Sequence, residues 1–93
     1  MKIFIDWKTI DTYEHFFDAF LPQVKAPDWH GKNLDALSDS LITGGINQVE
    51  PPFCVIYTNI ENMSVTAKNV YDAVGLIFDE ANEIGKKIRV FEE

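Results

Sequence analysis

The sequence PDWHGKNLDALSDSL, residues 27–41, joins an irregular half to a periodic half. Residues 27–32 mix proline, glycine and polar side chains without periodicity, which predicts a loop. Asn33 follows as a suitable N-cap, because its short side chain can accept a hydrogen bond from the first turn of a helix. The apolar residues after it recur at helical spacing and are expected to face inward: Leu34, Leu37 and Leu41.

Upstream of this segment the sequence predicts a short strand and an aromatic helix. The strand covers residues 2–5. Asp11, with Glu14 three residues later, is a capping-box-like pair that would begin the helix. Pro22 is expected to end or bend that helix, since it lacks a backbone donor. One apolar stripe at helical spacing predicts the buried face: Tyr13, Phe16, Phe17, Phe20 and Leu21.

Downstream, a longer loop runs from Thr43-Gly44-Gly45 to Pro51-Pro52, whose peptide bond is a candidate for the cis form. Residues 53–57 predict a buried strand. A long helix is expected to begin at Ser64 or Thr66 and to stop at Gly85, and residues 87–91 predict a last strand. The inward stripe of the long helix is expected to comprise Val70, Val74, Ile77, Phe78, Ala81 and Ile84.

Strands separated by helices imply parallel pairing through right-handed crossovers. The sequence therefore predicts an α/β fold: a small three-stranded parallel sheet with helices packed against it, in the order β-α-α-β-α-β. Residues 1–93 are expected to form a single domain.

The charge balance favours a basic partner. Eight Lys and Arg face fifteen Asp and Glu, which gives a formal charge of -7. Such a field repels phosphate backbones and anionic membranes and attracts cationic proteins. Direct binding of nucleic acid or of a membrane is not expected.

Cysteine usage and the apolar runs favour the cytoplasm. The lone Cys54 cannot form an internal disulfide and is expected to be a small buried hydrophobe, with a reactive thiol as the alternative. The first apolar run ends at Asp6, too early for a signal-peptide core, and no stretch is long enough to span a membrane.

No pattern predicts catalysis. The sequence lacks G-x-S-x-G, a phosphate-binding Gly-Lys-Ser/Thr loop and H-E-x-x-H. His15 and His30 lie far apart, without a cysteine cluster, and His15 is most simply a residue of a polar helix face. We expect no catalytic residue, metal site, cofactor or small-molecule substrate.

Two carboxylates in the short helix suggest a site. Asp35 and Asp39 are four residues apart, so their side chains project from one face, where like charges repel. The helix dipole favours an anion at Asp35, in the first turn, but gives Asp39 no such support. The residues alone leave three interpretations open: a solvated face, a site for a cation or basic partner, or catalytic or metal-binding carboxylates.

Trp29 admits two interpretations as well. A loop tryptophan commonly packs into the core. An exposed one beside an acidic patch has the composition of an interface anchor.

The segment resembles the barstar family, intracellular inhibitors of the ribonuclease barnase. The order of elements, the proline before the second strand, and residues 78–81 with Gly85 are also similar to that family. Ten positions carry the resemblance: Pro27, Trp29, Gly31, Asn33, Leu34, Asp35, Ala36, Leu37, Asp39 and Leu41.

The resemblance implies that the loop and short helix enter the cationic cleft of a microbial ribonuclease in a one-to-one complex. Asp39 would take the place of an RNA phosphate, Asp35 would meet neighbouring donors, and Glu80 would add a peripheral contact unless it is a solvated helix residue. The implied partner-binding set is Trp29, His30, Gly31, Asn33, Asp35, Ser38, Asp39, Ile42 and Glu80.

Two departures from the family lie near this surface. Ser38 stands where barstar has a tryptophan, and the 43–52 loop is about four residues longer and lacks the family's tryptophan there. An alternative partner is therefore a toxin domain, for which this chain would be the immunity protein, or a basic protein that is not a nuclease.

Overall fold

The computed structural model describes residues 1–43 and 51–93. Short 3₁₀ turns at Trp7–Thr9 and Ile60–Asn62 follow the first two strands, and a π-helical turn at Asp39–Thr43 continues the second helix. The helices and strands are, in chain order, β1 (Lys2–Asp6), α1 (Tyr13–Gln23), α2 (Leu34–Ser38), β2 (Phe53–Thr58), α3 (Val65–Glu83) and β3 (Ile88–Glu92).

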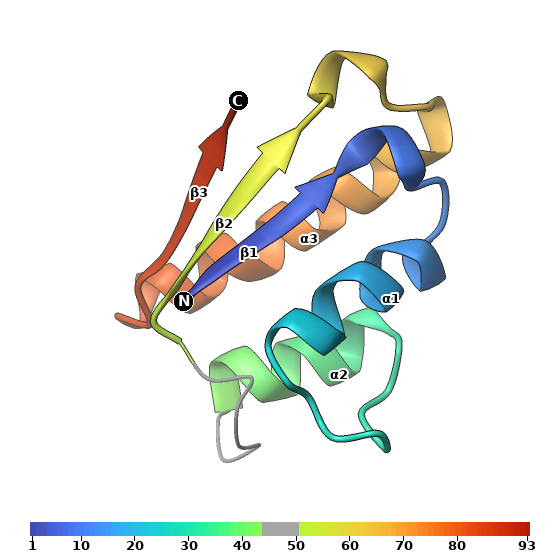
Figure 1. Cartoon of the computed structure of the whole chain (residues 1–93). Helices are drawn as coiled ribbons and strands as arrows, with labels where there is room; N and C mark the ends of the chain where they lie inside the picture. The colour runs from blue at the N-terminus through green and yellow to red at the C-terminus, as the bar shows by residue number, and fades with distance from the viewer. Residues whose placement is uncertain (44–50) are drawn as a thin grey trace.

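The three strands form one parallel sheet in the order β1-β2-β3 (Figure 1). In the register, Ile3 lies beside Val55, which lies beside Val90. This confirms the predicted α/β fold with its parallel sheet. The loop expected around Gly44 and Gly45 lies outside the described residues.

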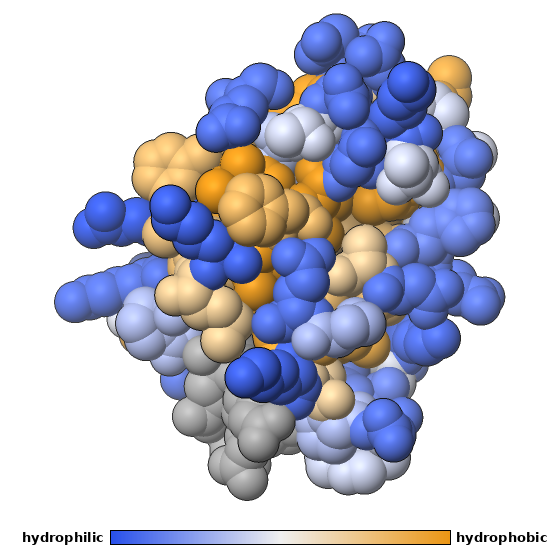
Figure 2. Space-filling model, viewed as in Figure 1, coloured by the Kyte–Doolittle hydropathy of each residue, from blue (hydrophilic) through white to orange (hydrophobic). Residues whose placement is uncertain are grey.

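The helices cover one face of the sheet and leave the other open. Figure 1 looks onto the open face, with α3 crossing behind the strands. There Phe4, Ile56 and Phe91 form one row across the sheet, and Figure 2 shows apolar side chains on this face with charged ones around them. Six side chains of the covered face are at most 3% exposed, whereas Val90 at the β3 edge is 40% exposed; the six are Ile3, Ile5, Phe53, Val55, Tyr57 and Ile88.

Aromatic rings occupy the space between sheet and helices. Phe20 of α1 stacks on Phe16, with ring centroids 5.4 Å apart, and contacts Phe53 at 5.9 Å and Phe78 at 6.3 Å. It therefore joins α1, β2 and α3 in one core, and it is fully buried. The predicted aromatic stripe of α1 is confirmed except at its start, where Tyr13 is 38% exposed.

Side-chain amides cover part of both sheet edges. On β1, the Gln23 side chain accepts from the Phe4 backbone N–H and donates to the Phe4 carbonyl, both at 2.7 Å. On β3, Asn82 makes the same pair of bonds with Ile88, at 2.7 and 2.9 Å. Each amide thus replaces a neighbouring strand at one residue.

The expected cap of α1 was wrong by one residue. Thr12, not Asp11, is the N-cap, and its hydroxyl accepts from the backbone N–H of His15 at 3.1 Å. The Asp11 carboxylate instead accepts from the Ser64 hydroxyl at 2.7 Å. The Asp11 backbone N–H donates to Nδ1 of the His15 ring. The Glu14 side chain was expected to be the acceptor of that bond. α1 ends at Gln23, directly after Pro22, as predicted.

Most other boundary predictions are confirmed. Asn33 caps α2 and Ser64 caps α3, and the Pro51-Pro52 bond is cis. Ile84 was wrongly assigned to the buried stripe: it is 56% exposed, because α3 ends at Glu83 and the helical period no longer sets its direction.

Cys54 is only half-buried, which corrects the expectation of a fully buried thiol. It alternates with Phe53 and Val55, which face the core, so its side chain lies on the open face.

Candidate partner-binding site

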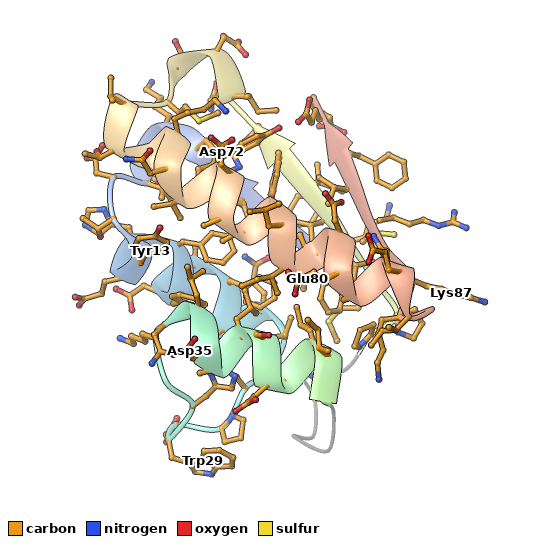
Figure 3. The ribbon with its side chains drawn as sticks, turned by 180° about the vertical axis from the view of Figure 1, so that it is seen from behind. Tyr13, Trp29, Asp35, Asp72, Glu80 and Lys87 are labelled. Carbon is orange, nitrogen blue, oxygen red and sulfur yellow. The ribbon has the colours of Figure 1, made fainter. Side chains whose placement is uncertain are left out.

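The loop between α1 and α2 presents its tryptophan to solvent. The Trp29 side chain is 73% exposed and extends away from the helices (Figure 3). The structure therefore excludes the interpretation that Trp29 packs into the core. An exposed indole of this kind is typical of an interface anchor.

Next to it, His30 faces inward. Its side chain is 5% exposed, and its ring Nδ1 lies 2.9 Å from the Gly31 carbonyl, which can only accept. Its Nε2 lies 2.6 Å from the Ser40 hydroxyl oxygen, and that oxygen lies 3.0 Å from the Ala36 carbonyl, so the single hydroxyl proton has two acceptors within reach. A buried network thus fastens the loop to the far end of the short helix, and His30 has little surface for a partner.

Two further contacts hold the loop in place. The Lys32 ammonium lies 2.6 Å from the Asp18 carboxylate of α1, and this bond raises the pKa of Lys32. A Cβ on Gly31 would lie 2.9 Å from the Asn33 amide and 3.2 Å from the Ala36 methyl. Glycine is therefore favoured there, because a larger residue would displace the Asn33 cap or the start of α2.

α2 has an N-cap at its start and continues into a π-helical turn at its end. The Asn33 side chain accepts from the Ala36 backbone N–H at 2.8 Å. After Ser38 the chain continues as a π-helical turn that starts at Asp39. Single π-helical turns are rare and are frequent at functional sites.

Both helix carboxylates are free to meet a partner. Asp35 and Asp39 are exposed, and within residues 1–43 and 51–93 neither forms an ion pair. Beside them, Ser38 and Ile42 are half-buried. α2 packs against α3, which carries the exposed Glu80 (Figure 3). The predicted acidic residues thus belong to two neighbouring helices.

The described part of the chain contains no group of three His, Cys, Asp or Glu side chains placed to hold a metal ion. Among those residues, no helix is both long and apolar enough to cross a membrane.

Comparison with known proteins identifies the family. A family model described as "Barstar (barnase inhibitor)" matches residues 1–92. The chain belongs to the barstar family. A relative in this comparison is the Bacillus subtilis (strain 168) protein named "Putative ribonuclease inhibitor YrdF", which is 33% identical over 82 residues. The alignment covers 88% of this chain and 86% of that protein.

In this barstar-family chain, sequence reasoning missed the residues that hold the loop. Ser40 is fully buried, although serine is usually exposed. Its position offered a signal: it lies three residues after Leu37 and directly before Leu41, on the inward face of the helix. A polar side chain on the inward face of a helix requires a buried hydrogen-bond partner, and for Ser40 this partner is His30.

We expect Ser40→Ala to destabilise the protein by about 1–3 kcal/mol, because it leaves the buried His30 Nε2 without its partner. Ser38→Ala is the matched control on the same helix, and it should change stability by less than about 0.5 kcal/mol. Urea unfolding of both variants measures the difference. Equal stability of the two variants would show that the His30–Ser40 bond contributes nothing.

Proposed function

We propose that this chain inhibits a barnase-like or related microbial ribonuclease by plugging its cationic active-site cleft. Membership of the barstar family supports a barnase-inhibitor-like, non-enzymatic role. The observation that carries the mechanism is the exposed pair Asp35 and Asp39 on a short helix, beside the exposed Trp29 of a fastened loop. In the proposed complex the loop and helix enter the cleft together.

The chemistry of a ribonuclease supports this assignment. Such an enzyme needs cationic groups that stabilise charge on the phosphate during cleavage. A carboxylate can accept the same charge-assisted hydrogen bonds and cannot be cleaved. Asp39 would take the phosphate position, Asp35 the donors beside it, and Glu80 a contact at the rim. Inhibition then requires only occupancy of the cleft.

The burial of the loop residues supports different proposed roles for them. The exposed Trp29 side chain would contact the enzyme directly. His30 and Gly31 would act by fixing the loop, since the His30 side chain is buried and a Cβ on Gly31 would press on the Asn33 cap. Asn33 would act by capping α2. Ser38 and Ile42 would flank the carboxylates.

The proposed site of action is the cytoplasm, where an unblocked ribonuclease would degrade the cell's own RNA. A charge of -7 would attract a basic enzyme over a distance of about one Debye length, roughly 8–10 Å at physiological salt. A fast encounter is useful when the enzyme must be stopped before it acts.

The purified chain is expected to abolish the activity of a microbial ribonuclease at a one-to-one molar ratio and to cleave no RNA itself. The test is a titration of RNA cleavage against a panel: barnase-like enzymes, other guanyl-specific nucleases, and any toxin domain encoded beside this gene. Inhibition of the toxin alone would make the chain its immunity protein. Full activity of every nuclease in the panel would refute the proposal.

The association rate should fall about tenfold or more between low and high salt, because the encounter depends on long-range attraction between opposite charges. The dissociation rate should change much less, since close contacts are screened less. Stopped-flow measurement of both rates provides the test. A flat association rate would contradict electrostatic steering.

A further inference from the structure

A groove of about 900 Å³ lies between α3 and β3. It is separate from the acidic site: Asp72 of the groove and Glu80 beside α2 lie on different sides of α3 (Figure 3). None of the residues assigned to ribonuclease binding lines it. Ribonuclease binding therefore does not account for this groove.

The groove runs beside a strand edge that is free for part of its length. The Ile88 N–H and carbonyl point away from β2, because Asn82 binds both of them. Alternate residues of a strand direct their backbone groups to the same side, so those of Val90 and Glu92 also face outward. Within the described residues, no backbone group pairs with them. Such an edge can accept another extended chain.

Gly75 leaves the α3 side of the groove open. It lies in the middle of a 19-residue helix, where glycine is less favourable than alanine. A Cβ built on it would meet no atom within 4 Å. No contact in the described structure therefore requires glycine here, whereas a chain that approaches α3 closely would.

A buried hydroxyl also lacks a partner in the groove. Tyr57 lines the groove and is 3% exposed. Its hydroxyl makes no hydrogen bond to any residue of 1–43 or 51–93. Buried polar groups are nearly always paired. A partner that settles deep in the groove would have to reach past its surface to supply the missing bond, because the hydroxyl itself is closed to solvent.

The charges of the groove select the partner. Asp72, Asp79 and Glu92 line it. Asp72 is paired with Lys68, and Glu92 accepts from the Tyr71 hydroxyl, whereas the exposed Asp79 has no ion-pair partner among the described residues. The surface between these carboxylates is apolar: Leu76 is 64% exposed and Val90 is 40% exposed. Lysine and arginine suit such a surface, because their stems are apolar and their ends are cationic.

We propose that this groove binds an extended, basic segment of a second partner protein, which pairs with β3 as a fourth strand. Basic side chains of the segment lie along Leu76 toward Asp79, and its backbone bonds to Val90 and Glu92. The proposal does not depend on the ribonuclease assignment.

A peptide titration tests the pairing. The probe is an acetylated and amidated heptapeptide of alternating lysine and valine, added to the isotope-labelled full chain. Amide NMR shifts are expected at Val90, Glu92 and residues 72–79. A peptide with glutamate in place of lysine should bind at least tenfold more weakly. Equal affinity of the two peptides, or shifts confined to α2, would overturn the proposal.

Substitutions in the groove make the test specific. Gly75→Leu fills the groove where space is open and should fold normally, yet weaken peptide binding at least tenfold. Asn69→Leu adds the same side chain at an exposed position of α3 outside the groove and should bind like the unmodified chain. Val90→Pro removes one outward N–H, which an edge strand tolerates, and should also weaken binding. Unchanged binding by folded Gly75→Leu would overturn the proposal.

Two further measurements separate this site from its alternatives. Asp39→Ala should bind the peptide with unchanged affinity, and a loss would assign the peptide to the ribonuclease site instead. Sedimentation of the free chain should show a monomer. A dimer that Gly75→Leu abolishes would mean that a second copy, and not a basic partner, occupies the groove.

Discussion

Asp39→Ala is expected to weaken the complex with the ribonuclease more than any other single truncation. The carboxylate stands at the start of the π-helical turn, is exposed, and has no ion-pair partner among the described residues. In the proposed complex its removal leaves enzyme cations buried and unpaired. The expected loss is about 2–5 kcal/mol, or roughly 30-fold to several thousand-fold in Kd.

The same experiment includes its controls. Asp35→Ala should have the next largest effect and Glu80→Ala a smaller one. Asp79→Ala removes the same charge from an exposed position of α3 outside the acidic site, so it should leave Kd nearly unchanged. Thermal midpoints should hardly move, because loss of Asp39 relieves repulsion with Asp35. Undiminished binding by Asp39→Ala would refute the plug, and a collapse of stability would make Asp39 a structural residue.

Phe20→Ala should destabilise the protein more than Ser40→Ala or Phe4→Ala does. The ring contacts three other aromatic rings, from α1, β2 and α3, and is fully buried. Truncation of such a phenylalanine costs about 3–5 kcal/mol, because it removes buried area and leaves a cavity. That is a large part of the roughly 5–15 kcal/mol that stabilises a typical domain. The thermal midpoint should fall by about 12 °C or more.

Phe4→Ala is the matched control, since it removes the same ring from the open face, where it is 56% exposed. Its cost should be about 1 kcal/mol or less. Guanidinium unfolding of both variants gives the comparison. Similar losses would mean that the open face contributes to the core as much as the aromatic cluster does.

The periodic parts of the sequence predicted the fold well, because burial imposes their spacing. The Phe16–Leu21 stripe and the long helix that begins after Ser64 illustrate this. Two of the errors fall where periodicity stops, whereas Cys54 was misassigned inside β2, because a continuous apolar run does not reveal which of its residues face the open side. Either Asp11 or Thr12 could cap α1; in the fold Thr12 does so, and the Asp11 carboxylate binds Ser64, which lies 53 residues away. Ile84 kept the helical spacing but lies one residue beyond the helix.

The charged residues of the candidate site could be predicted from the sequence, whereas the contacts that hold its loop in place could not. Asp35 and Asp39 stand out because like charges at that spacing are unfavourable in an isolated helix. The His30–Ser40 bond joins two polar residues ten positions apart, one in a loop and one on an apolar helix face. Neither residue is unusual alone. Their pairing follows only from the path of the loop, which local sequence patterns do not describe.

The glutamine amide on β1 limits how many copies of this chain could associate through their sheets. Open-ended polymerisation requires every added copy to offer a fresh edge for the next one. Gln23 occupies the middle of the β1 edge at Phe4, so that edge cannot take a full strand. Only the β3 edge can then pair with another copy. Two copies joined through β3 would present only their blocked β1 edges to a third copy. The Gln23 side chain therefore limits association through the sheets to two copies and prevents growth into a fibre.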